Sequence, residues 1–195
     1  MAENIARTLR ERSLRRILKW VLWLGIIATV GYGLYLLSKS DESEQPLGED
    51  LSRAVLILGA QHIPEDAPKP TYNSNPPTSG PHFAIPAHVG FYVRELPDER
   101  VIHNMEHGDV WISYKPSIPQ EVKDALRAVA EKDIKVIVTS RAANDTQIAL
   151  ASWGRIDTFD LEDGALDLAR VKGFILRYKN KGPESVIDSG SHLPK

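Results

Sequence analysis

The chain of 195 residues contains no cysteine. Disulfide bonds, thiolate nucleophiles and thiolate-held zinc or iron–sulfur centres are therefore excluded. A metal ion bound by this chain would have to use imidazole, carboxylate, thioether or backbone oxygen ligands.

Positive charge is scarce after the first nineteen residues. Residues 1–19 hold six of the 24 basic side chains and two of the 26 acidic ones, so the rest of the chain carries a formal charge of −6. Nucleic-acid binding depends on basic side chains that neutralise phosphates. The composition therefore predicts no nucleic-acid partner.

A long apolar run occurs at residues 17–37, where only Lys19 and Thr29 interrupt it. About twenty residues of helix cross the hydrocarbon core of a bilayer. Aromatic residues lie toward both ends of the run, as they do at membrane interfaces. The run predicts a single-pass transmembrane helix. A cleaved signal peptide is the alternative, but the run is long for one and no small-residue cleavage site follows it.

The charges on either side of this run predict its orientation. Arginines precede it and acidic residues follow it, so the N-terminus is expected in the cytoplasm. The expected organisation is a cytoplasmic basic segment, a transmembrane helix, a linker, an extracytoplasmic domain and a flexible tail, at residues 1–16, 17–37, 38–50, 51–185 and 186–195.

The pattern of the domain indicates an α+β fold, with a small, mainly antiparallel sheet and two packed helices. Strands are expected at residues 91–94, 100–103, 109–114, 135–139 and 147–153, and helices from about Ser117 and over residues 163–179. Residues 51–60 are apolar and fit either a short helix or a buried strand. Seven prolines between Pro64 and Pro86 predict a surface loop.

Five of the six histidines lie within 46 residues, from His62 to His107. Imidazole is the commonest metal ligand and suits zinc and copper. The clustering predicts a metal site formed by His62, His82, His103 and His107. His88 and His192 have the character of ordinary surface histidines.

The segment from His103 to Gly108 places two histidines four positions apart. The order His-x-x-Glu-His resembles an inverted zinc-protease signature in letters only, because Gly108 and an apolar strand follow at once. We expect two ligands at the entrance of a strand, with Glu106 orienting or neutralising the site from outside the ligand set. Hydrogen bonds from the two rings to loop backbone are the alternative. Met105 is expected in the core.

The loop from Pro76 to His82 is expected to deliver His82 to this site. Ser79 lacks the strand–turn–helix setting of a nucleophile. With Thr78, it is expected to hydrogen-bond nearby backbone instead.

The chain resembles a family of bacterial membrane-anchored proteins, domain-of-unknown-function family 3105. The likeness covers about residues 55–185, and its motifs are Gly59-Ala-Gln-His62-Ile, Pro76-Pro-Thr-Ser-Gly-Pro-His82, Gly90-Phe-Tyr92, His103-Asn-Met-Glu-His-Gly108, Ala151-Ser-Trp-Gly154 and Gly182-Pro-Glu184. Met105 stands where the family would have leucine. The resemblance implies one domain anchored to a bacterial inner membrane on its periplasmic or extracellular side, and no established activity.

Three classes of function remain open. The leading hypothesis is an extracytoplasmic domain that binds copper or zinc through its histidines. The second is a metal-dependent hydrolase or oxidase, with Glu106 as general base at an open coordination position. The third is a module without metal that contacts an envelope protein partner.

Overall fold

The computed structural model describes residues 15, 19–33, 35 and 48–184, and the chain divides into two units, Met1–Glu44 and Gln45–Lys195. In the first unit residues 19–33 are helical. Among the described residues, no helix combines the length and apolar character needed to cross a membrane. The predicted span 17–37 lies partly outside these residues, as do most of segment 1–16 and the tail 186–195.

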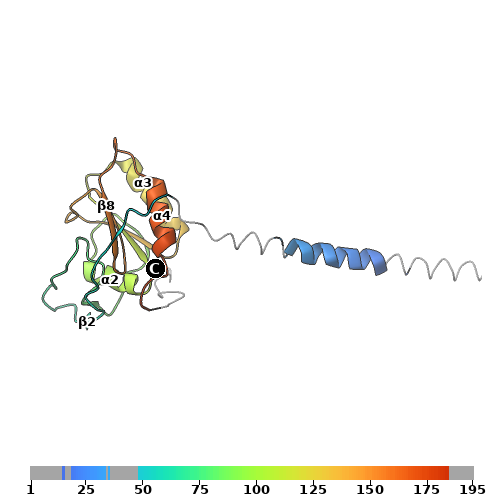
Figure 1. Ribbon diagram of the computed structural model, residues 1–195, viewed down its shortest axis with the longest axis horizontal. Coiled ribbons are helices and arrows are strands. Elements are labelled where there is room, and N and C mark those ends of the chain that lie inside the picture. The colour runs from blue at the N-terminus through green and yellow to red at the C-terminus, as the bar shows by residue number, and fades with distance from the viewer. Residues whose placement is uncertain (1–14, 16–18, 34, 36–47, 185–195) are drawn as a thin grey trace, which may run out of the picture. The chain divides into compact units, whose positions relative to one another are not determined.

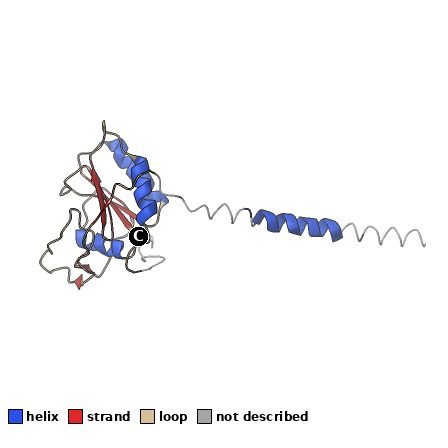
Figure 2. Ribbon diagram, in the orientation of Figure 1, coloured by secondary structure: helices blue, strands red, loops and turns tan. Residues whose placement is uncertain are grey.

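The second unit is built on a six-stranded mixed sheet (Figures 1 and 2), in the order β1-β8-β7-β5-β6-β4. The strands are β1 (Arg53–Ala54), β4 (Gly90–Tyr92), β5 (Val110–Tyr114), β6 (Val136–Ser140), β7 (Ile148–Ser152) and β8 (Arg155–Phe159). Strands β4, β5 and β6 run parallel, whereas β5, β7, β8 and β1 pair antiparallel. The α+β class is therefore confirmed, with a larger and more mixed sheet than expected.

Three helices cover the two faces of this sheet: α2 (Asp98–Glu106), α3 (Gln120–Lys132) and α4 (Leu168–Tyr178). Side chains of β5 alternate between the faces, as strand geometry requires. Ile112 packs in one apolar cluster with Leu126 of α3 and Phe174 of α4. Trp111 packs in the other with Met105 of α2. Helices α3 and α4 thus lie on one face and α2 on the opposite face.

Helix α2 corrects the prediction of a strand at residues 100–103. Pro97 precedes the helix, and Asp98 and Glu99 occupy its first turn. Proline and acidic residues both favour a helix start. The β-branched pair Val101 and Ile102 suggested a strand, but burial against the sheet outweighs that weak local preference.

Two further expectations differ from the structure. Residues 51–60 form no helix, and their only strand is the exposed two-residue β1. Leu56 is 77% exposed. Helix α3 begins at Gln120 after Pro119, with no side-chain cap. The helix therefore begins three residues after the expected start at Ser117.

The start of the second unit is tied to the end of α4. The Ser52 hydroxyl donates to the Tyr178 hydroxyl at 2.8 Å, and Tyr178 donates in turn to the Asp50 carboxylate. Nearby, Arg177 donates to the carbonyl oxygen of Gly48 at 2.5 Å. The last turn of α4 therefore fixes the point at which the chain enters the domain.

Candidate metal centre

Two histidines are brought together by a short parallel ladder between β2 (His62–Ile63) and β3 (His82–Phe83). His62 and His82 are direct partners in its register. The ladder is extended by the bond from the His82 amide to the Gln61 carbonyl oxygen at 2.9 Å. Side chains of paired residues share a face, so the two imidazoles lie side by side.

Helix α2 supplies the other side of the cluster. His103 and Glu106 occupy its last turn, where residues three apart share a face. His107 is the C-terminal cap, and Gly108, at φ 84°, ends the helix. The side chains of Val101, Ile102 and Met105 are buried in the apolar cluster beneath α2. The helix is therefore held to the sheet while His103 and Glu106 approach β2 and β3.

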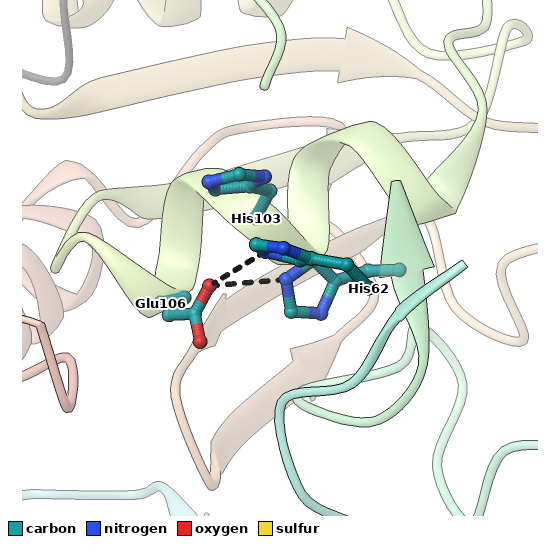
Figure 3. Close-up of side chains that lie close together, drawn as sticks. His62, His103 and Glu106 are labelled. Atoms are coloured by element: carbon teal, nitrogen blue, oxygen red, sulfur yellow. Dashed lines mark hydrogen bonds and ion pairs between the residues drawn. The ribbon is translucent and has the colours of Figure 1, made fainter. Parts of the chain in front are cut away.

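The ligand atoms of His62, His82, His103 and Glu106 all lie within 4.8 Å of one another. Figure 3 shows His62, His103 and Glu106 pointing toward a common point. The Glu106 Oε2 atom is 3.0 Å from His82 Nε2 and 3.7 Å from His62 Nε2. His82, His103 and Glu106 are buried, whereas the His62 side chain is 49% exposed. The cluster is thus enclosed by the protein except at His62.

Backbone carbonyls fix the proton on two of these rings. His82 Nδ1 lies 2.8 Å from the Gly80 carbonyl oxygen, and His103 Nδ1 lies 2.7 Å from that of Phe83. A carbonyl oxygen can only accept, so Nδ1 carries hydrogen on both rings. In the neutral rings the Nε2 atoms therefore present lone pairs to the cluster.

Burial also favours the neutral ring. It lowers the pKa of His103, against the opposing effect of the bond to Phe83. The His82 Nε2 atom lies 3.0 Å from the Glu106 carboxylate, and with hydrogen only on Nδ1 it is an acceptor, as the carboxylate is. Two acceptors at that distance require a cation or a proton between them.

His107 lies at the margin of this group. Its Nε2 is 3.2 Å from His103 Nε2 and 3.2 Å from Glu184 Oε2. Its Nδ1 is buried with no hydrogen-bond partner among the described residues. A second group with metal-binding distances consists of Glu106, His107 and Glu184, and it shares only Glu106 with the first.

Buried polar residues hold the helix end that carries these side chains. Lys135 Nζ donates to the His107 carbonyl oxygen at 3.0 Å and lies 3.2 Å from the Asp109 carboxylate. The Asn104 amide donates to the same carboxylate at 3.0 Å and to the Ala87 carbonyl oxygen at 2.9 Å. Burial raises the pKa of Asp109, whereas the hydrogen bond from Asn104 and the positive charge of Lys135 lower it. This support limits movement of His103 and His107.

The structure thus brings His62, His82 and His103 together and places His107 beside them rather than among them. The pair His103 and His107 lies just before strand β5, as expected, but it stands at the end of helix α2, which was not expected. Glu106, expected outside the ligand set, has its carboxylate among the ring nitrogens. His88 is exposed.

Two further residues of the motifs have the expected kind of role. Met105 belongs to the apolar core, as predicted. The Ser79 hydroxyl accepts a bond from the Leu58 amide at 3.0 Å. The expectation for Thr78 is wrong, because its buried hydroxyl has no hydrogen-bond partner among the described residues. Among the candidate ligands, Glu184 was missed by the sequence reasoning. Its only signal was the Gly182-Pro-Glu184 motif, which gives no indication of what lies beside it.

Comparison with known proteins gives one family. The family described as "Protein of unknown function (DUF3105)" matches residues 64–190, a range that includes every candidate ligand except His62. No curated protein and no solved structure matches the chain.

Proposed function

The chain belongs to the DUF3105 family of proteins of unknown function, and from that premise we propose that its buried cluster binds a zinc or copper ion. The ligands are His62, His82, His103 and Glu106, whose ligand atoms lie within 4.8 Å of one another. Such spacing suits atoms that each lie about 2.0–2.2 Å from a single ion.

One observation carries the proposal. His82 and His103 each donate Nδ1–H to a backbone carbonyl. Their Nε2 atoms face other potential ligands, the buried Glu106 carboxylate at 3.0 Å from His82 and His107 Nε2 at 3.2 Å from His103. Metal-binding histidines nearly always show this arrangement, because the outer hydrogen bond fixes the ring and its tautomer. A histidine scaffold without metal has no need to fix two rings from outside and gather their Nε2 atoms among other potential ligands.

The ligand set favours particular ions. Three imidazoles and one carboxylate without thiolate suit zinc, and copper is the main competitor for nitrogen-rich sites. The half-exposed His62 gives an ion a route from solvent to the buried ligands. It is also the ligand that water or a substrate would most easily replace, and this favours the metal-dependent hydrolase or oxidase as second candidate.

The proposal includes the location of the domain. The apolar residues 17–37 anchor it to a bacterial inner membrane, with the arginine-rich N-terminus in the cytoplasm and the domain outside. The support is the length of the apolar run and the charges on either side of it. Outside the cytoplasm an envelope protein partner is accessible to the domain.

The test is metal analysis of the purified full chain after loading with zinc(II) or copper(II) and dialysis. We expect at least one ion per chain in the wild type, and loss of the tightly held ion in His82→Ala and His103→Ala. The exposed His88→Ala variant is the matched control and should retain its metal. A wild-type chain that holds neither ion would refute the proposal and favour an interaction module without metal.

A further inference from the structure

The segment 180–184 is fastened to the end of α2 by backbone hydrogen bonds. The Asn180 amide donates to the Gly108 carbonyl oxygen at 2.7 Å. The Glu184 amide donates to the Glu106 carbonyl oxygen at 3.1 Å. These two bonds lie on either side of the helix end that carries the candidate ligands.

Gly182 allows the two backbones to touch. A Cβ atom at this position would lie 2.1 Å from the Glu106 carbonyl oxygen and 2.5 Å from the Gly108 nitrogen. These distances are far below van der Waals contact, so no larger residue fits without moving the segment. The close approach is thus specified by the sequence, and it determines where Glu184 lies.

As a result, a second carboxylate reaches the cluster. Glu184 Oε2 lies 3.2 Å from His107 Nε2, and Glu106, His107 and Glu184 have ligand atoms within 4.8 Å of one another. A carboxylate has two oxygen atoms and about four lone pairs. Glu106 can therefore contact one ion beside His82 and another beside His107.

We propose that Glu106, His107 and Glu184 form a second metal position, and that Glu106 bridges the two ions. This inference rests on the proposed function, because the bridge needs an ion at the first position. Pairs of ions about 3.5–4 Å apart are a recurring arrangement in hydrolytic enzymes, where they bind the attacking and leaving oxygens of a substrate. The second position, with two carboxylates, suits zinc better than copper(I).

The second ion binds more weakly than the first. His107 Nε2 faces two acceptors, His103 Nε2 and Glu184 Oε2, which favour a hydrogen on this nitrogen in the metal-free protein. An ion must displace that hydrogen, and Nδ1 has no partner among the described residues to receive it, unlike the carbonyl-bonded Nδ1 atoms of His82 and His103. Loss of such outer support typically weakens metal binding about 10- to 100-fold. Glu184 is also 55% exposed. We expect two zinc equivalents that bind in separate phases at least about tenfold apart.

The test is titration of the full chain with zinc(II), combined with metal analysis. Glu184→Gln should remove the weaker equivalent and leave the tighter one. Gly182→Ala, which alters no ligand, should do the same by displacing the segment. Glu131→Gln, which changes an exposed carboxylate on α3, is the control and should retain both.

The outcomes separate the two proposals. One equivalent in the wild type, or two in Glu184→Gln, would show that His107 and Glu184 form only a hydrogen bond, and the second position would be refuted while the first stands. No bound zinc or copper in the wild type would refute both. Because Glu184→Gln leaves the backbone contacts intact, the test remains decisive even if Gly182→Ala does not fold.

Discussion

Replacement of Glu106 by glutamine should leave the stability of the metal-free protein nearly unchanged and remove most of the stability gained from zinc. The carboxylate is buried, and its Oε2 lies 3.0 Å from His82 Nε2, which presents a lone pair when the ring is neutral. Glutamine has nearly the same shape and can turn an N–H toward this nitrogen. In the metal-free protein a proton must lie between these two acceptors, and the N–H of glutamine takes its place.

The magnitudes differ enough to measure. Exchange of one hydrogen bond for another changes the free energy of unfolding by less than the roughly 0.5–1.5 kcal/mol that one such bond contributes. Zinc(II) at 100 times its Kd stabilises a folded protein by about 2.7 kcal/mol. For a domain near 140 residues this raises Tm by about 10 °C. In Glu106→Gln, Tm should therefore stay close to that of the wild type in EDTA and should rise little with zinc.

Thermal unfolding followed by circular dichroism, with EDTA and with zinc(II), measures both effects. Glu131→Gln serves as the control for loss of one carboxylate. If His82 is instead an imidazolium paired with Glu106, removal of one charge from this buried pair costs about 3–5 kcal/mol. A large fall in the Tm of metal-free Glu106→Gln would therefore refute the reasoning and identify a salt-bridged scaffold.

Three further predictions concern stability. Arg141→Lys should lower the free energy of unfolding by about 3–5 kcal/mol in urea titrations, because the buried guanidinium donates to Asp98 at 2.9 and 2.8 Å and lysine cannot keep both bonds; an unchanged midpoint would contradict this. The stability of the metal-free protein should fall as the pH drops below about 6.5, because burial lowers the pKa of His103 and the unfolded chain therefore binds a proton more readily than the folded one. Urea titrations in EDTA at pH 8, 6 and 5 measure the free energy of unfolding, and equal free energies at all three pH values would contradict the prediction. Gly108→Ala should lower the free energy of unfolding by about 1–3 kcal/mol, because residue 108 has φ 84° and an added Cβ would lie 2.8 Å from Asn180 Cα. A Tm equal to that of the wild type would show that segment 180–184 moves aside at no cost.

The sequence could predict the α+β class and the gathering of histidines, because both leave local signals. Strand β5 alternates between the two clusters as its pattern indicates. The prediction failed at α2, where the β-branched pair Val101 and Ile102 outweighed the start signals of Pro97 and Asp98. Burial against the sheet decides that segment, and burial is not visible in a short window of sequence.

The arrangement of the candidate site was beyond local reasoning. His62 and His82 are joined by a two-residue parallel ladder, too short to leave a pattern in the sequence. Glu184 approaches His107 only because Gly182 meets the backbone of Glu106, a contact between segments almost eighty residues apart. Residue type thus indicated the chemistry, whereas the packing of distant segments determines which ligands meet.

The last turn of α4 has a consequence for local opening of the domain. Tyr178 holds the entrance at Asp50 and Ser52, and two residues later Asn180 begins the segment that carries Glu184. Fraying of this turn therefore releases the start of the domain at Asp50 and Ser52 together with the Glu184 carboxylate. Backbone amides of Ser52 and Glu184 should accordingly exchange hydrogen with solvent as one cooperative group, slowed together when zinc is bound.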